Sequence, residues 1–286
     1  MLIWCAFILA FASQEPARPL PDAGGFRESV RGIIAVLEGS LFRATMHIDF
    51  IPEAAKYTYT EKETVITRDS KSGREKIETN VYDMTRGPEG WQYYRKLISK
   101  NGSALTDREN QEQDRKHAAF ENSVRASLKA NDVSAAREEQ AGDNDLRAMF
   151  DIRVAGRDRI DGVPVVLLEL KPDPKYKPKS VYGKRWQHVF LRVWETEDSH
   201  EVVRLIAELG DPYDVGFAVI EKGAAVSVER RLVNGEVWLP VRIEVTSRQD
   251  RPDGNKLTPR EHVIAEFSDF KRFSVDVDIR PGGPVQ

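Results

Sequence analysis

Cysteine is almost missing from this sequence, and neither sign of charge is in large excess. The chain has 286 residues with one cysteine, and 43 basic residues against 46 acidic ones give a net charge of −3. A single cysteine excludes an internal disulfide and a centre built on several cysteine ligands. Nucleic-acid binders usually show a basic surplus or stripe, whereas here both signs are mixed along almost every segment, so we expect no nucleic-acid partner. An apolar content of 40% predicts a folded globular protein.

Long apolar runs are also scarce, and the clearest one lies at the amino terminus. Residues 2–12 are apolar and end in Ala10-Phe11-Ala12, a small-x-small pattern typical of signal-peptide cleavage sites. The run is about half the roughly 20 residues that a helix needs to cross a bilayer, so a transmembrane anchor is the weaker interpretation. We therefore predict a signal peptide over residues 1–12, a mature chain that begins near Ser13, and a periplasmic location.

The lone cysteine lies inside this segment. Cleavage near Ala12 would remove Cys5 and leave a mature chain without a thiol. A lipid anchor on Cys5 is the alternative if translation starts further upstream, although Trp4 is an unfavourable residue before a lipidated cysteine. Residues 13–22 contain three prolines and are expected to form an extended leader.

An amphipathic helix is predicted after the leader. Five apolar residues lie at i, i+4, i+7, i+8 and i+11, which places them in one stripe of a helix, and Gly39 follows as a stop signal. They are Phe26, Val30, Ile33, Ile34 and Leu37. We expect this stripe to pack on the protein's own sheet, where it can also line a ligand site.

Most of the remaining sequence predicts strands, because β-branched and aromatic residues recur with period two between glycine-containing turns. Residues 57–67 alternate, meet a polar turn at 69–73 and return through 76–84, which predicts a long hairpin, and 91–99 predicts a further strand. Pairs that suit two-residue hairpin turns are Asn101-Gly102, Asp161-Gly162 and Asn234-Gly235. Consecutive hairpins predict an antiparallel meander, which either closes into a barrel or leaves one face to be covered.

A charged segment interrupts this pattern. Residues 106–141 are rich in Ala, Glu, Gln and Arg and begin with Thr106-Asp107-Arg108-Glu109, which has the form of a capping box. We predict a helical insertion. Its apolar stripe is thin, with Phe120, Val124 and Leu128 spaced by four, so the insertion should be mostly solvated. A polar lid and a passive spacer fit the sequence equally well.

No group of residues indicates a reaction. His200-Glu201-Val202-Val203-Arg204 partly matches the His-Glu-x-x-His zinc helix, but arginine stands at the fifth position and the residues around it predict a strand, so we expect no metal there. The sequence contains no Gly-x-Ser-x-Gly elbow, no phosphate-binding glycine loop and no cysteine nucleophile. We predict no catalytic residue, no metal ligand and no cofactor, and we expect that the protein is not an enzyme.

The carboxyl-terminal half carries a family resemblance. It rests on residues 162–174, on Val193-Trp194-Glu195 with 202–205, on Val237-Trp238-Leu239-Pro240 and on 267–273. The Trp-Leu-Pro and Ser-Asp-Phe-Lys-Arg-Phe pieces are its most diagnostic parts. Over about residues 25–274 the chain resembles the bacterial periplasmic LolA/LolB-like superfamily of lipoprotein carriers, which includes outer-membrane lipoprotein-sorting protein homologues.

The resemblance implies an α+β fold in which a curved antiparallel sheet, an incomplete β-barrel, wraps around the amino-terminal helix. It implies one domain over residues 23–274, with a tail at 275–286. The chain departs from the family in its charged insertion and in lacking a stretch that matches the carrier's lipoprotein-handling arginine.

The resemblance also implies a function. It points to a non-catalytic periplasmic carrier or binding protein for lipid or lipoprotein acyl chains, with an envelope membrane protein as a further partner. The alternative is an envelope scaffold or lipid-sensing regulatory protein that has the same fold and no transported ligand.

The acyl-chain site that this resemblance predicts has two walls. One wall is the helical stripe from Phe26 to Leu37. The opposing wall consists of strand residues that share a face through period-two alternation, namely Tyr57, Tyr59 and Val65, together with Trp91 and Tyr93. The same apolar residues would equally form a filled core, so the sequence leaves a lined cavity and a packed interior both open.

Overall fold

The structure of the chain is a computed structural model. The residues that it describes are 54–68, 72–86, 93–127, 145, 148–214, 219–247, 249–250 and 260–272. The predicted signal peptide, leader, amphipathic helix and tail lie outside these residues, as does the part of the charged insertion from residue 128 to residue 141.

Strands dominate the described residues. In the first half the elements are the short 3-10 helix η2 (Ala54–Lys56), β1 (Tyr57–Arg68), β2 (Glu75–Arg86), β3 (Tyr93–Lys100), β4 (Ser103–Ala104) and the helix α2 (Asp107–Ser127). The second half contains β5 (Phe150–Ile160), β6 (Val163–Pro172), the helix α4 (Val181–Trp186), β7 (Val189–Thr196), β8 (Val202–Leu209), β9 (Tyr213–Asp214), β10 (Val219–Ile220), β11 (Ala225–Val233), β12 (Val237–Ser247), β13 (Gln249–Asp250) and β14 (Arg260–Arg272).

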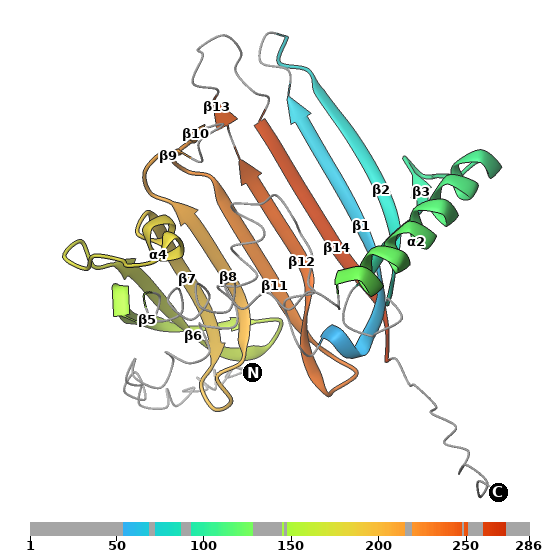
Figure 1. Ribbon diagram of the computed structural model, residues 1–286. Helices are drawn as coiled ribbons and strands as arrows, with labels where there is room; N and C mark the ends of the chain where they lie inside the picture. The colour runs from blue at the N-terminus through green and yellow to red at the C-terminus, as the bar shows by residue number, and fades with distance from the viewer. Residues whose placement is uncertain are drawn as a thin grey trace, which may run out of the picture.

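One large antiparallel sheet organises the described chain. Its eleven strands lie in the order β4-β3-β2-β1-β14-β12-β11-β8-β7-β6-β5, and Figure 1 shows them side by side as a broad sheet whose strands twist and bend. Two meanders thus meet in the middle, where β1 pairs with β14. Within the described residues the sheet is open, with β4 and β5 as its outer strands. Strands β9, β10 and β13 form a separate small sheet.

The hairpins form where the sequence predicts them. Strands β1 and β2 pair from Tyr59–Met84 to Arg68–Glu75, which confirms the long first hairpin. Asn101, Asp161 and Asn234 all have positive φ, as do the glycines that follow them. Such turns match the right-handed twist of the strands that they join, which explains why Asn-Gly and Asp-Gly recur here.

The sheet has an apolar face and a polar face. Alternate side chains of the long strands form one continuous buried cluster, on the side that we call the inner face. A row of cross-strand neighbours illustrates it: Ala265 of β14, Ile243 of β12, Leu205 of β8 and Leu168 of β6 are all fully buried. We call the opposite side, which carries most of the charged strand residues, the outer face.

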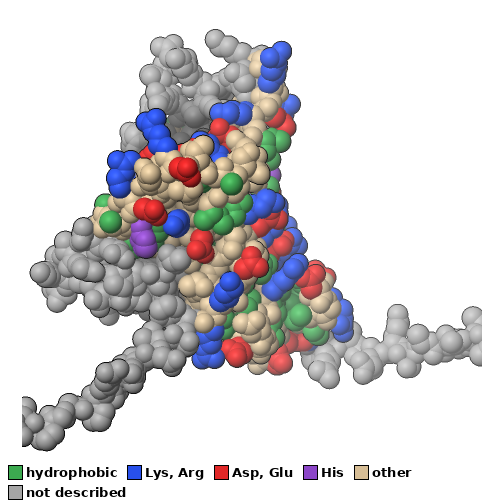
Figure 2. Space-filling view, turned by 90° about the vertical axis from the view of Figure 1, so that its right-hand side faces the viewer, with side chains coloured by type: hydrophobic (Ala, Val, Ile, Leu, Met, Phe, Trp, Pro, Cys, Tyr) green, Lys and Arg blue, Asp and Glu red, His purple; other side chains and the backbone are tan. Residues whose placement is uncertain are grey.

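Helix α2 confirms the helical interpretation of the insertion as far as Ser127. The amide N–H of Thr106 donates to Oε2 of Glu109 at 2.9 Å, and Oγ1 of Thr106 accepts from the Glu109 amide at 3.4 Å, so the predicted capping box forms. The helix packs on the outer face of β3, where the ring of Tyr94 stacks on His117 at 4.3 Å and meets Phe120 at 5.5 Å. Figure 2 shows charges of both signs interspersed on this side of the molecule.

A buried carboxylate holds the segment before α4. Asp145 accepts hydrogen bonds from the Tyr176 hydroxyl at 2.8 Å, from the Lys179 amide at 2.9 Å, and from the amide and hydroxyl of Ser180 at 2.7 and 2.5 Å. Ser180 is also the N-cap of α4, whose Trp186 is fully buried in the inner cluster. Asp145 therefore fixes where α4 enters the core.

Candidate ligand-binding face

Strand β1 brings its predicted wall residues to the inner face. Tyr57 and Tyr59 are 3% and 2% exposed, and Val65 lies on the same face and is half-buried. The ring of Tyr59 packs edge-on against Phe267 of β14 at 5.7 Å. The hydroxyl of Tyr57 donates to Glu236 at 3.3 Å; burial, reinforced by this carboxylate, raises the pKa of Tyr57. These residues are fixed in a packed apolar layer.

The other predicted site residues lie wholly or partly outside the described part of the structure. Tyr93 belongs to β3 and pairs with Arg86, which places it in register with the inner face, but its side chain is outside the description. Trp91 lies outside the described residues. So does the whole helical stripe, which consists of Phe26, Val30, Ile33, Ile34 and Leu37. The two-walled site therefore remains a prediction.

A charged cluster lies on the inner face at the β3 end of the sheet. Arg95 of β3 reaches across β2, and its Nη2 donates to Glu61 at 2.6 Å and to Glu63 at 2.7 Å, both on β1. Its guanidinium lies 3.6 Å from the centroid of the Tyr82 ring on β2, a cation–π contact. Burial opposes the charge of Arg95, but attraction and hydrogen bonds from Glu61 and Glu63 outweigh it and raise the pKa of Arg95.

Sequence reasoning missed this cluster, although part of the signal was present. Glu61 and Glu63 continue the period-two positions of Tyr57 and Tyr59, so alternation places both carboxylates on the apolar face. Glu61 is only 1% exposed, and a buried carboxylate needs a cation or several hydrogen-bond donors. Which group meets this need depends on the pairing of three strands, and that pairing cannot be read from a local pattern.

The buried carboxylates are engaged in structural contacts. Glu61 binds Arg95, Asp145 binds the segment before α4, and Glu195 lies 3.8 Å from His200. None of the three lines either of two pockets that lie within the described part of the chain. Their arrangement therefore gives no support to acid–base catalysis in a cleft.

The segment after His200-Glu201 forms β8, as predicted, rather than a metal-binding helix. The described residues contain no cluster of three His, Cys, Asp or Glu side chains suited to a metal ion. No helix in the described ranges is long and apolar enough to cross a bilayer.

The outer face has a different character. A row of opposite charges runs across its strands. Lys62 pairs with Glu266 at 3.0 Å, and Glu266 also lies 3.5 Å from Arg242. Further along, Arg204 pairs with Glu229 at 2.6 Å. Two shallow pockets lie on this face. One is lined by residues of β6, β7 and β8, and the other by residues of β8 and β11 with the β5–β6 turn.

Comparison with known proteins finds likeness only among solved structures. No family model matches the chain, and no curated protein matches it. A DUF1329 family protein from Desulfovibrio piger is 12% identical, with a TM-score of 0.29, and the match covers 88% of this chain and 94% of that one.

Two other structures carry the names that the sequence resemblance suggests. An outer membrane lipoprotein-sorting protein domain from Vibrio parahaemolyticus is 11% identical, with a TM-score of 0.27 and coverage of 80% and 89%. A LolA superfamily protein from Nitrosomonas europaea is 12% identical, with a TM-score of 0.25 and coverage of 78% and 90%. The likeness to LolA-like proteins is one of fold, and at these TM-scores it carries no functional argument.

Proposed function

We propose that the protein is a non-catalytic periplasmic binding protein or carrier for lipid or lipoprotein acyl chains. The observation that supports this most directly is the inner face, an apolar layer that is continuous across a wide, open antiparallel sheet. Such a layer matches the chemistry of a hydrocarbon chain, which needs apolar contact and no hydrogen-bond partners.

The size of the hydrophobic gain is sufficient for carriage. At about 0.8 kcal/mol per buried CH₂, a sixteen-carbon chain gains roughly 13 kcal/mol before the cost of ordering the complex. In this proposal the acyl chain contacts the inner face around the half-buried Val65, beyond the packed ring of Tyr59. Its polar end lies beside Arg95, because that cluster is where the apolar layer gives way to charge.

Two adjacent residues of β1 provide a matched test. Val65 and Ile66 are both half-buried, but Val65 lies on the inner face and Ile66 on the outer face. Val65→Asp places a charge on the proposed binding face, so we expect it to weaken binding of an acyl-chain fluorophore at least about tenfold. Ile66→Asp should leave that binding unchanged, and melting temperatures should show that both variants fold. If Val65→Asp does not fold, Val65→Thr is the substitute variant, because threonine has nearly the same side-chain volume as valine and adds a polar hydroxyl.

Native mass spectrometry of protein purified from its own envelope tests the ligand directly. Co-purified lipid or acylated peptide would support the proposal. A parent protein that carries no lipid and binds no acyl probe would contradict it and would favour the alternative of an envelope scaffold or lipid-sensing regulatory protein. Equal losses in Val65→Asp and Ile66→Asp would show that the probe does not use the inner face.

A further inference from the structure

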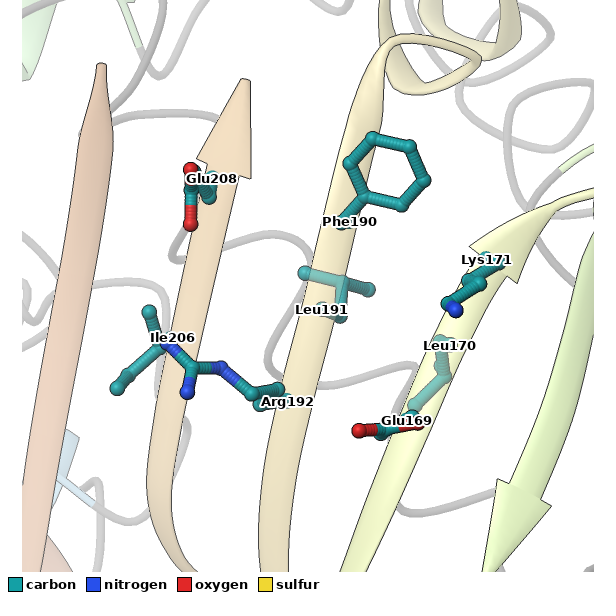
Figure 3. Close-up of a pocket in the computed structure, with 8 residues that line it drawn as sticks. All are labelled: Glu169, Leu170, Lys171, Phe190, Leu191, Arg192, Ile206 and Glu208. Carbon is teal, nitrogen blue, oxygen red and sulfur yellow. The ribbon is translucent and has the colours of Figure 1, made fainter. Parts of the chain in front are cut away.

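A cation, an aromatic ring and an anion lie side by side on the outer face. Phe190 of β7 pairs with Glu208 of β8 on one side. On its other side lies β6, where Leu170 pairs with Leu191 of β7. The next residue of β6, Lys171, therefore lies beside Phe190. We call Lys171, Phe190 and Glu208 the Phe190 row. Figure 3 shows the row on three neighbouring strands, where it lines a shallow pocket of about 140 Å³.

The aromatic ring in the middle of the row is both exposed and supported. Phe190 is 44% exposed. One side of its ring lies against Gly210, where a Cβ would overlap the ring. The backbone therefore holds the ring in place while its other side is left to solvent.

The two charges of the row, like that of Arg192 in the same pocket, differ from the paired charges elsewhere on this face. Lys62 pairs with Glu266, and Arg204 pairs with Glu229. By contrast, Lys171 and Glu208 form no ion pair with any other residue that the structure describes. Their charges are thus available to a group from outside the chain.

Strands β6, β7 and β8 carry apolar residues on both faces. Val165 and Trp194 are buried on the outer face, with Leu167 and Ile206 packed against them, and Ile206 also lines the pocket beside Phe190. Antiparallel sheets with one solvated face usually alternate apolar and polar residues, and strands that are apolar on both faces are typical of strands covered on both faces. The Phe190 row adjoins this second apolar cluster through Ile206.

We propose that the Phe190 row joins two copies of this chain. The two-fold axis of this dimer runs parallel to β7 and lies between the two facing sheets. Rotation about it reverses the order of the row in the second copy, so each Lys171 faces Glu208 of the other copy. The two Phe190 rings then meet between the two ion pairs. Opposite charges flanking a central ring are the complementarity that an isologous contact requires, because both partners present the same patch. A partner with one sign of charge would satisfy only half of the row.

Charge reversal tests this pairing. Sedimentation velocity over a wide concentration range should show a reversible dimer for the parent protein. Lys171→Glu and Glu208→Lys should each raise the dissociation constant at least about tenfold, because each brings like charges together at two symmetric contacts. An equimolar mixture of these two variants should dimerise again, as should the double variant K171E/E208K.

Two further variants separate the contact from effects on the fold. Phe190→Ser should abolish the dimer while the variant still unfolds cooperatively, because Phe190 is 44% exposed and lies outside the inner cluster. Ile77→Ala, at an exposed apolar position on β2, is the matched control and should leave the dimer intact. A monomeric parent at all concentrations, or a mixture of Lys171→Glu and Glu208→Lys that remains monomeric, would overturn the proposal. A monomeric parent that captures another protein through Phe190 would overturn it as well.

Discussion

Asp145 is a single residue on which several backbone and side-chain donors depend. Its carboxylate accepts from Tyr176, Lys179 and Ser180, and it is 2% exposed. In Asp145→Asn the side-chain NH₂ replaces a carboxylate oxygen, so a hydrogen-bond donor faces the donors of Tyr176, Lys179 or Ser180. We therefore expect a loss of about 2–4 kcal/mol in the free energy of unfolding. Urea unfolding measures it. Asp151→Asn, at an exposed position of β5, is the control and should change stability by less than about 0.5 kcal/mol.

The same residue makes a pH-dependent prediction. Burial would raise the pKa of Asp145, but hydrogen bonds from Ser180, Lys179 and Tyr176 outweigh it and hold the pKa below the ordinary value of 3.8. A carboxyl group with a lower pKa in the folded chain stabilises the fold above its unfolded pKa, and this contribution is lost as the pH falls through the folded pKa. The stability difference between the parent and Asp145→Asn should therefore be full at neutral pH and shrink below about pH 4. A constant difference down to pH 2 would show that ionisation plays no part.

At the scale of the element, α2 depends on one aromatic contact. Tyr94 stacks on His117, meets Phe120, and donates from its hydroxyl to the Gln113 carbonyl at 2.8 Å. A charged helix without a wide apolar stripe gains most of its stability from such docking. Tyr94→Ala should therefore speed hydrogen exchange of the α2 amides at least about tenfold and leave β11 and β12 protected.

Strand β3 supplies the control for this experiment. Ile98 of β3 is 42% exposed, so Ile98→Ala should leave exchange in α2 unchanged. Equal exchange in the parent and in Tyr94→Ala would mean that α2 is stable without its contact to β3.

At the scale of the whole molecule, β14 is the strand on which both meanders depend. It pairs with β1 on one side and with β12 on the other. A chain that ends at residue 259 leaves one edge of β1 and one edge of β12 without a partner strand, and we expect it to lose cooperative unfolding. A chain that ends at residue 274 keeps β14 and should stay within about 1 kcal/mol of the parent. Cooperative unfolding of the shorter chain would show that one meander folds alone.

Much of this architecture could be predicted from local sequence. The period-two pattern of β1 and β2, the Asn234-Gly235 turn and the Thr106 capping box all act over a few residues. The pairing of β1 with β14 could not be predicted in this way, because it joins residues such as Lys62 and Glu266 that are 204 positions apart.

The candidate site shows the same limit. Alternation correctly put Tyr57 and Tyr59 on one face with Val65, whereas the Arg95 cluster requires knowledge of which strands are neighbours. The second apolar cluster on the outer face was also missed, because a run such as Val163–Pro172 reads as one strand whether one or both of its faces are covered.

The central position of the β1–β14 pair has a consequence for the order of events during synthesis. Strand β14 follows all the other described strands in the chain, so the middle of the sheet cannot close until those strands have been made. Until then β1 and β12 present unpaired edges, which are templates for association with other chains. Contacts of such long sequence separation also form slowly. We therefore expect the unfinished protein to be prone to aggregation, and a chaperone that shields the free edge of β1 until β14 arrives should raise the folding yield.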